Sequence, residues 1–143
     1  MTLANKESAI ILAFDFGTKR IGVAIGQRVT KIARPLITLS AKKGILPWDK
    51  LTQLIKRWQP QELVVGLPLN MDGTEQPLTQ QARVFAKRLE ERYQLPVHEM
   101  DERLTTVAAR EHLFEQGGYQ ALQAGQVDSV AAQYILQAWL DKL

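Results

Sequence analysis

The strongest constraint on the fold is an apolar run near the start of the chain that ends in an aspartate. Residues 10–14 read IILAF, a continuous apolar stretch typical of a strand that is covered on both faces. Asp15 follows this run directly, and burying a carboxylate is costly unless it is paired or binds a cation. Gly17 and a second apolar run at residues 21–25 come next. We therefore expect two strands joined as a hairpin, with Asp15 at its turn.

The turn of this hairpin carries donors that suit a phosphate group. Thr18, Lys19 and Arg20 supply hydroxyl, ammonium and guanidinium groups beside the carboxylate of Asp15. Most surface Lys and Arg side chains are simply solvated, so the pattern alone leaves both interpretations open.

The later hydrophobic patterns alternate between strands and helices. Residues 31–39 predict a third, antiparallel strand, with Pro35 at a sheet edge or bulge. Further strands are expected at 62–67 and 97–100, and helices at 47–58, 78–93, 105–115 and from Asp128, with Thr74 capping the second helix. This order predicts an α/β fold with a mixed five-stranded sheet and helices on both faces. We expect residues 1–143 to form a single domain.

Composition narrows the functional classes. The chain has 143 residues and no Cys, which excludes a disulfide framework and thiolate ligands. No apolar run resembles a signal peptide or membrane span, so we expect a cytoplasmic protein without a membrane partner. The net charge of +3 is a mild bias toward polyanions. The three tryptophans are expected to serve packing rather than base stacking.

Acidic residues recur where the predicted parallel strands end. Asp101 and Glu102 follow the strand at 97–100, and Asp128 opens the last helix. Ligand sites of open α/β sheets lie beyond the carboxyl ends of the strands, so these groups should converge with Asp15. Carboxylates that close repel one another unless cations neutralise them, and oxygen ligands suit Mg²⁺ or Mn²⁺. One or two such ions would support in-line phosphodiester hydrolysis by an activated water. Taken singly, Asp15 has an alternative explanation as a turn former, Asp101 and Glu102 are explained as well by a helix start, and Asp128 is more typical of a residue that stabilises a helix start than of a ligand.

Four motifs resemble one known family over residues 9–140. DFGTKRIGVAIG, VVGLPLNMDGT, DERLTT and DSVAAQYIL occur in the order and at the intervals of the bacterial YqgF family, described as pre-16S ribosomal RNA nucleases and, in an older assignment, as Holliday junction resolvases. The resemblance implies a ribonuclease H-like fold and a divalent-metal nuclease site of the two-metal-ion type. It assigns Asp15, Glu102 and Asp128 as catalytic metal ligands, with Asp101 as a fourth ligand. RuvC-like resolvases keep an acidic residue where this chain has Leu67-Pro68, so that role moves to the DER motif.

The resemblance also implies partners. The expected substrate is structured RNA, cut at the 5′ end of pre-16S rRNA during ribosome biogenesis, and the residues expected to bind it are Thr18, Lys19, Arg20, Asn70 and Arg103. Branched DNA is the alternative, and because junction resolution needs two symmetric cuts it would require a homodimer rather than a monomer. A non-catalytic nucleic-acid-binding module and a sugar-kinase-like phosphate-binding domain are further alternatives.

Overall fold

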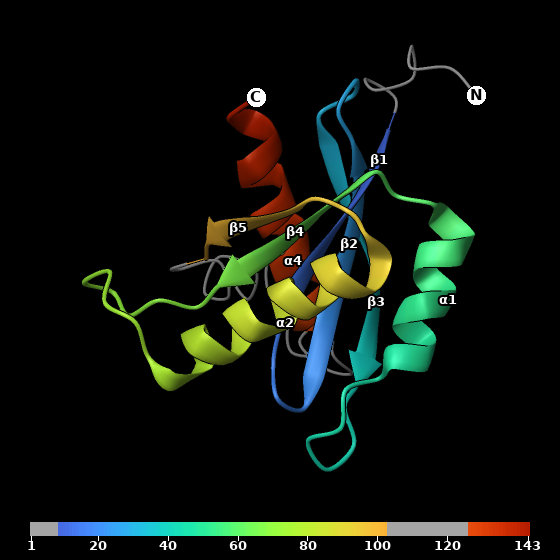
Figure 1. Ribbon diagram of the computed structural model, residues 1–143. Helices are drawn as coiled ribbons and strands as arrows, with labels where there is room; N and C mark the ends of the chain where they lie inside the picture. The colour runs from blue at the N-terminus through green and yellow to red at the C-terminus, as the bar shows by residue number, and fades with distance from the viewer. Residues whose placement is uncertain (1–8, 103–125) are drawn as a thin grey trace.

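A five-stranded mixed sheet forms the centre of the computed structural model, which describes residues 9–102 and 126–143. The strands are β1 (Ile10–Phe16), β2 (Arg20–Gln27), β3 (Ile32–Ser40), β4 (Glu62–Leu67) and β5 (Val97–Asp101). Their order across the sheet is β3-β2-β1-β4-β5, with antiparallel pairs among the first three strands and parallel pairs β1–β4 and β4–β5 (Figure 1). The predicted mixed sheet is confirmed, whereas the helix expected at 105–115 lies outside the described residues.

Helices cover both faces of the sheet, as the sequence predicts. The helices α1 (Trp48–Trp58) and α2 (Pro77–Tyr93) pack on one face, and α4 (Gln126–Asp141) crosses the other (Figure 1). None of the helices in the described part of the chain has the length and hydrophobicity that spanning a lipid bilayer requires.

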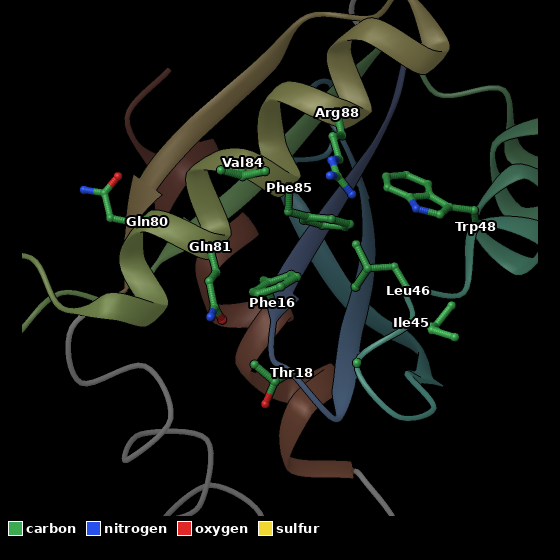
Figure 2. A pocket seen from close by; sticks show the side chains of 11 residues that line it. Phe16, Thr18, Ile45, Leu46, Trp48, Gln80, Gln81, Val84, Phe85 and Arg88 are labelled. Atoms are coloured by element: carbon green, nitrogen blue, oxygen red, sulfur yellow. The ribbon is translucent and has the colours of Figure 1, made fainter.

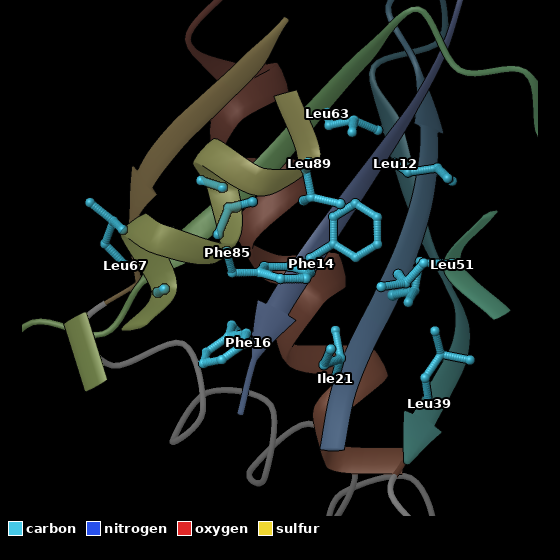
Figure 3. Close-up of a cluster of buried hydrophobic side chains, with 14 of the residues drawn as sticks. Leu12, Phe14, Phe16, Ile21, Leu39, Leu51, Leu63, Leu67, Phe85 and Leu89 are labelled. Atoms are coloured by element: carbon cyan, nitrogen blue, oxygen red, sulfur yellow. The ribbon is translucent and has the colours of Figure 1, made fainter. Parts of the chain in front are cut away.

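Apart from Asp15, strand β1 is apolar because side chains from both of its faces are buried. Phe14 and Phe16 join the cluster beneath α1 and α2, where both rings pack against Phe85 with centroids 5.8 and 5.0 Å apart (Figure 3). Ile11 and Ala13 join the cluster beneath α4. Successive side chains of a strand point to opposite faces, so Asp15, which lies between Phe14 and Phe16, points to the α4 face.

Pro35 lies on an edge strand opposite an irregularity in the sheet. Strand β3 is at the end of the strand order, and its register with β2 shifts between Val23 and Ala24, where Ala24 pairs with Pro35. Proline has no N–H to donate to a sheet ladder, so an edge or a bulge is where a strand tolerates it. Both features that the sequence predicts for Pro35 are present.

The start of α2 differs from the sequence-based prediction. Thr74 does not cap the helix, because its hydroxyl donates to Asp72 Oδ1 at 2.6 Å and accepts from Asn70 Nδ2 at 3.0 Å within the preceding loop. Gln76 is the N-cap, and it forms a reciprocal capping box with Thr79. Pro77 at the first helical position sets this later start, since its fixed φ suits that place.

Candidate active site

Asp15 is a partly accessible carboxyl group at the carboxyl end of β1. It pairs with Gly22 of β2 and lies one residue before the end of its strand. Burial raises the pKa of Asp15 to about 6, against a hydrogen bond with the Glu102 side chain that lowers it, and the negative charge of Asp128 raises it further. Its carboxyl group is therefore in the electrostatic range of both other acidic residues that the sequence places here.

Glu102 follows the end of β5 and is buried, with 7% of its surface exposed. Its backbone N–H donates to the carbonyl oxygen of Leu67 at 3.1 Å, which ties it to the end of β4. Burial is the largest cause that raises its pKa, to about 10, and the nearby charge of Asp15 is the second. The pair formed by Asp15 and Glu102 therefore retains a proton at neutral pH in the absence of a cation.

Gly66 provides the space through which Glu102 reaches Asp15. Strand β4 lies between β1 and β5, so a side chain from the end of β5 has to cross β4 to contact β1. A Cβ atom on Gly66 would lie 2.7 Å from Oε2 of Glu102, closer than such atoms pack. The missing side chain of Gly66 is thus a requirement for the Asp15–Glu102 contact.

Asp128 enters the site from the first turn of α4. A Cβ atom on Gly22 would collide with the backbone carbonyl of Asp128, so this glycine lets the start of α4 lie directly on β2 beside Asp15. The Asp128 carboxylate accepts a hydrogen bond from Arg20 Nε at 2.8 Å. Arg20 thereby compensates the negative charge of Asp128.

The donor atoms suit a hard divalent cation. Asp15, Glu102 and Asp128 offer only carboxylate oxygens, the ligands that Mg²⁺ and Mn²⁺ prefer. Within residues 9–102 and 126–143, no three acidic or imidazole side chains are grouped closely enough to hold one ion together. The buried Asp15–Glu102 pair is the part of the site that fits an ion as it stands, and Asp128 would have to exchange Arg20 for the ion.

The other site residues predicted from the sequence are exposed wherever the structure describes them. Thr18, Lys19 and Arg20 are exposed in the turn after β1 and at the start of β2. Asp101 is exposed at the end of β5, where its charge adds to the raised pKa of Glu102. Asn70 is exposed in the loop after β4, and Arg103 lies outside the described residues.

Gly22 and Gly66 are positioning residues that the sequence reasoning missed. Both are glycines inside strands, at GVAIG in β2 and VVGL in β4. A glycine within a strand often marks a close approach by another part of the chain, so a signal was present. The sequence alone does not say which segment approaches.

The fold is ribonuclease H-like, the fold class that RuvC-like resolvases share. Thermus thermophilus RuvC in complex with a Holliday junction substrate is similar with a TM-score of 0.57 and 14% identity, covering 94% of each chain. The fowlpox virus Holliday junction resolvase gives a TM-score of 0.56 at 15% identity, covering 94% of this chain and 99% of that one. Similarity at this level of identity establishes the fold alone, and it confirms the predicted fold class.

Closer relatives identify the family. The family model described as "RuvX: Holliday junction resolvase" matches residues 9–142. A protein of Escherichia coli O7:K1 named "Putative pre-16S rRNA nuclease" is 56% identical over 135 residues, covering 94% of this chain and 98% of the relative. A protein of the same name from Actinobacillus pleuropneumoniae serotype 7 is 57% identical over 131 residues, covering 92% and 96%. The chain belongs to the RuvX family, which confirms the resemblance to YqgF proteins.

Proposed function

We propose that this protein is a metal-dependent nuclease that processes the 5′ end of pre-16S rRNA during ribosome biogenesis. The observation that carries the proposal is the hydrogen-bonded pair of the partly accessible Asp15 and the buried Glu102, with Asp128 beside it, at the carboxyl ends of β1 and β5. Buried carboxyl groups with raised pKa values at a strand-end site are typical of functional sites. The family and the names of its members supply the nucleic-acid substrate.

The carboxylates and the turn residues Thr18, Lys19 and Arg20 have different functions. Asp15, Glu102 and Asp128 hold the cation, and Thr18, Lys19 and Arg20 bind the phosphates on either side of the bond that is cut. Two bound Mg²⁺ or Mn²⁺ ions would activate the attacking water and stabilise the leaving oxygen. Arg20 compensates the charge of Asp128 in the metal-free protein, and it would be available to a phosphate if Asp128 held an ion instead.

Branched DNA is the second candidate substrate. The family model carries the description of a Holliday junction resolvase, and this description favours it. Resolution of a junction needs two symmetric cuts, so this function requires a two-fold dimer whose two sites face one junction. A protein that remains monomeric when it is bound to a junction would argue against this substrate.

The nuclease assignment is tested with purified protein and RNA that spans the 5′ end of 16S rRNA in its precursor. We expect Mg²⁺ or Mn²⁺ to support cleavage, EDTA to abolish it, and Asp15→Asn to abolish cleavage while the RNA still binds. Glu99→Gln, a neutral substitution of an exposed β5 carboxylate, is the matched control and should cut normally. Binding by every variant without any metal-dependent cleavage would instead indicate a non-catalytic RNA-binding module.

A further inference from the structure

A cavity of about 600 Å³ lies on the α1 and α2 side of the sheet, at the carboxyl end of β1 (Figure 2). The rings of Phe16 and Phe85 lie at its centre, and Trp48 packs against Phe85 with ring centroids 5.9 Å apart. Thr18 lies at one end of the cavity and Arg88 at the other (Figure 2). The cavity is therefore aromatic in its middle and polar at its ends.

The cavity adjoins the carboxylate site through consecutive residues of β1. Asp15 points to the α4 face and Phe16 to the face that carries the cavity, and their Cα atoms are only about 3.8 Å apart along the chain. The turn residue Thr18 lines the cavity and is also one of the predicted phosphate-binding residues. A polymer that crosses the end of β1 would thus meet the carboxylates on one side of the sheet and the cavity on the other.

A tight turn holds an exposed apolar side chain at the mouth of the cavity. Lys43 and Gly44 both have positive φ, at 52° and 76°, and the N–H of Ile45 donates to the carbonyl oxygen of Lys42 at 2.9 Å. Ile45 is 72% exposed, and Val84 on the opposite rim is 52% exposed. Both side chains line the cavity, so its mouth presents apolar surface that water contacts in the ligand-free protein.

The charges around the cavity favour a ligand attached to phosphate. Arg88 lines it, none of the described lining residues is acidic, and Arg92 lies over the ring of Trp48 at 4.5 Å from the centroid. Gln81 places an amide, which both donates and accepts hydrogen bonds, toward the Thr18 end (Figure 2). An aromatic slot with an amide and a cationic rim matches a heterocyclic base better than a lipid or a cationic ligand.

We propose that this cavity binds one unstacked base of the nucleic acid whose cleaved phosphate lies at the cation site of Asp15, Glu102 and Asp128. The inference rests on the proposed nuclease function and adds to it a determinant of substrate position. The volume of the cavity lies in the range of about 300–1,000 Å³ that is usual for ligand pockets. Single-stranded nucleic acids are recognised mainly by stacking of splayed bases on aromatic side chains. Trp48 is the partly exposed ring that a base can contact here, and the buried rings of Phe16 and Phe85, 7% and 1% exposed, form the floor beneath it.

The test is abasic scanning combined with filling of the cavity. A short single-stranded oligoribonucleotide and its series of singly abasic derivatives are titrated against the Asp15→Asn protein, which binds without cutting. We expect loss of one particular base to weaken binding roughly tenfold or more, as the removal of a stacking partner does. Val84→Trp, which fills the cavity from its exposed rim, should weaken binding of the intact oligonucleotide and abolish the difference between positions. Val84→Ala, the matched control, should preserve it.

A second variant keeps the inference testable if Val84→Trp does not fold. Ile45→Glu changes an exposed turn residue, and its negative charge at the mouth should weaken binding of the intact oligonucleotide more than binding of the derivative that lacks the critical base. Equal affinity for all abasic derivatives, or an unchanged position dependence in Val84→Trp, overturns the inference.

Cleavage by the unmodified protein separates this inference from the nuclease proposal. If Mn²⁺ supports cutting of the oligonucleotide but no base is critical, the base site is wrong and the nuclease function stands. If one base is critical but no cutting occurs, the base site stands and the nuclease function is wrong. Absence of both binding and cutting overturns both.

Discussion

The carboxyl groups of Asp15 and Glu102 hydrogen-bond to each other across β4, through the space that Gly66 leaves open. Two carboxylates in such contact need a shared proton or a cation, because both negative charges together are unfavourable in a buried position. This contact therefore links the metal-free protein, which keeps a proton there, to the metal-bound state that the proposed function requires.

Filling the space at Gly66 should disable the site while leaving most of the fold intact. In Gly66→Ala the new methyl group would press on Glu102 and on the side chain of Ile135. We expect the free energy of unfolding to fall by about 1–3 kcal/mol, the usual cost of overpacking, and the affinity for Mn²⁺ to fall with it. Denaturant titration and Mn²⁺ titration measure the two effects.

The control for this substitution is Gly44→Ala. Gly44 has φ of 76° and no atom near the position of a new Cβ, so only backbone strain of about 1 kcal/mol is added. The affinity of the Gly44→Ala protein for Mn²⁺ should equal that of the unmodified protein. A Gly66→Ala protein that binds Mn²⁺ as the unmodified protein does would contradict the role assigned to Gly66.

The metal-free protein should become less stable as the pH rises. The folded-state pKa of Glu102 is raised to about 10 and that of Asp15 to about 6, so the folded state holds protons that the unfolded chain has already released. Stability then declines between the unfolded-state values near 4 and these folded values, by up to about 1.4 kcal/mol per pH unit for each proton. Denaturant titrations in EDTA between pH 5 and pH 9 would measure this slope.

Glu102→Gln should flatten that slope, because an amide cannot ionise and still donates a hydrogen bond to Asp15. The variant is expected to be more stable than the unmodified protein at alkaline pH and close to it near pH 5. Glu99→Gln, at an exposed position of β5, should retain the original slope. Parallel pH profiles for the unmodified protein and Glu102→Gln would show that Glu102 carries no such proton.

The opposite pH dependence is expected at the other end of the sheet. Arg28 donates to both oxygens of Glu62, at 2.7 and 2.8 Å, and this pairing lowers the pKa of Glu62. A lowered pKa contributes stability above the unfolded-state value, and that contribution is lost as the pH falls through the folded-state value. Glu62→Gln should cost about 1–2 kcal/mol at pH 7, and the cost should shrink in acid.

The exposed pair of Glu75 and Arg83 supplies the comparison for Glu62. The side chain of Glu75 is 42% exposed and that of Arg83 is 40% exposed. Because solvent screens such a pair, Glu75→Gln should change the free energy of unfolding by less than about 1 kcal/mol. Equal losses in Glu62→Gln and Glu75→Gln would contradict a special role for the Arg28–Glu62 pair.

Arg20 should matter for nucleic-acid binding more than for stability. Its ion pair with Asp128 is exposed on the arginine side, at 57%, and such pairs contribute about 1 kcal/mol or less. If Arg20 binds a phosphate, Arg20→Gln should reduce the slope of log affinity against log salt by about 0.7 for single-stranded RNA. Lys56→Gln, on α1, is the control and should leave the slope unchanged. Identical slopes in the two variants would remove Arg20 from the interface.

The sequence was informative about the sheet because its signals are local. The IILAF run, the ELVVGL run and the position of Pro35 each reflect burial or backbone chemistry at the residue concerned, and all three predictions agree with the structure. Thr74 shows the limit of this reasoning, because a residue suited to cap a helix is instead bound by Asn70 and Asp72 in the preceding loop.

The arrangement of the site depended on contacts between distant segments. Asp15, Glu102 and Asp128 were each identifiable from strand ends and motifs, but the hydrogen bond across Gly66 and the pairing of Asp128 with Arg20 follow from the packing of β4, β5 and α4. Trp48 was expected to serve packing alone. It does pack against Phe85, and it also lines the cavity beside β1, which no periodic pattern in α1 or α2 reveals.

The central claim is that Asp15, Glu102 and Asp128 form one cation site, and Mn²⁺ titration followed by electron paramagnetic resonance tests it most directly. The unmodified protein should bind one or two ions, and Asp15→Asn, Glu102→Gln and Asp128→Asn should each weaken binding by about tenfold or more, the scale at which even residues that only support metal ligands act. Unchanged Mn²⁺ binding in all three variants, or no binding by the unmodified protein, would contradict the account.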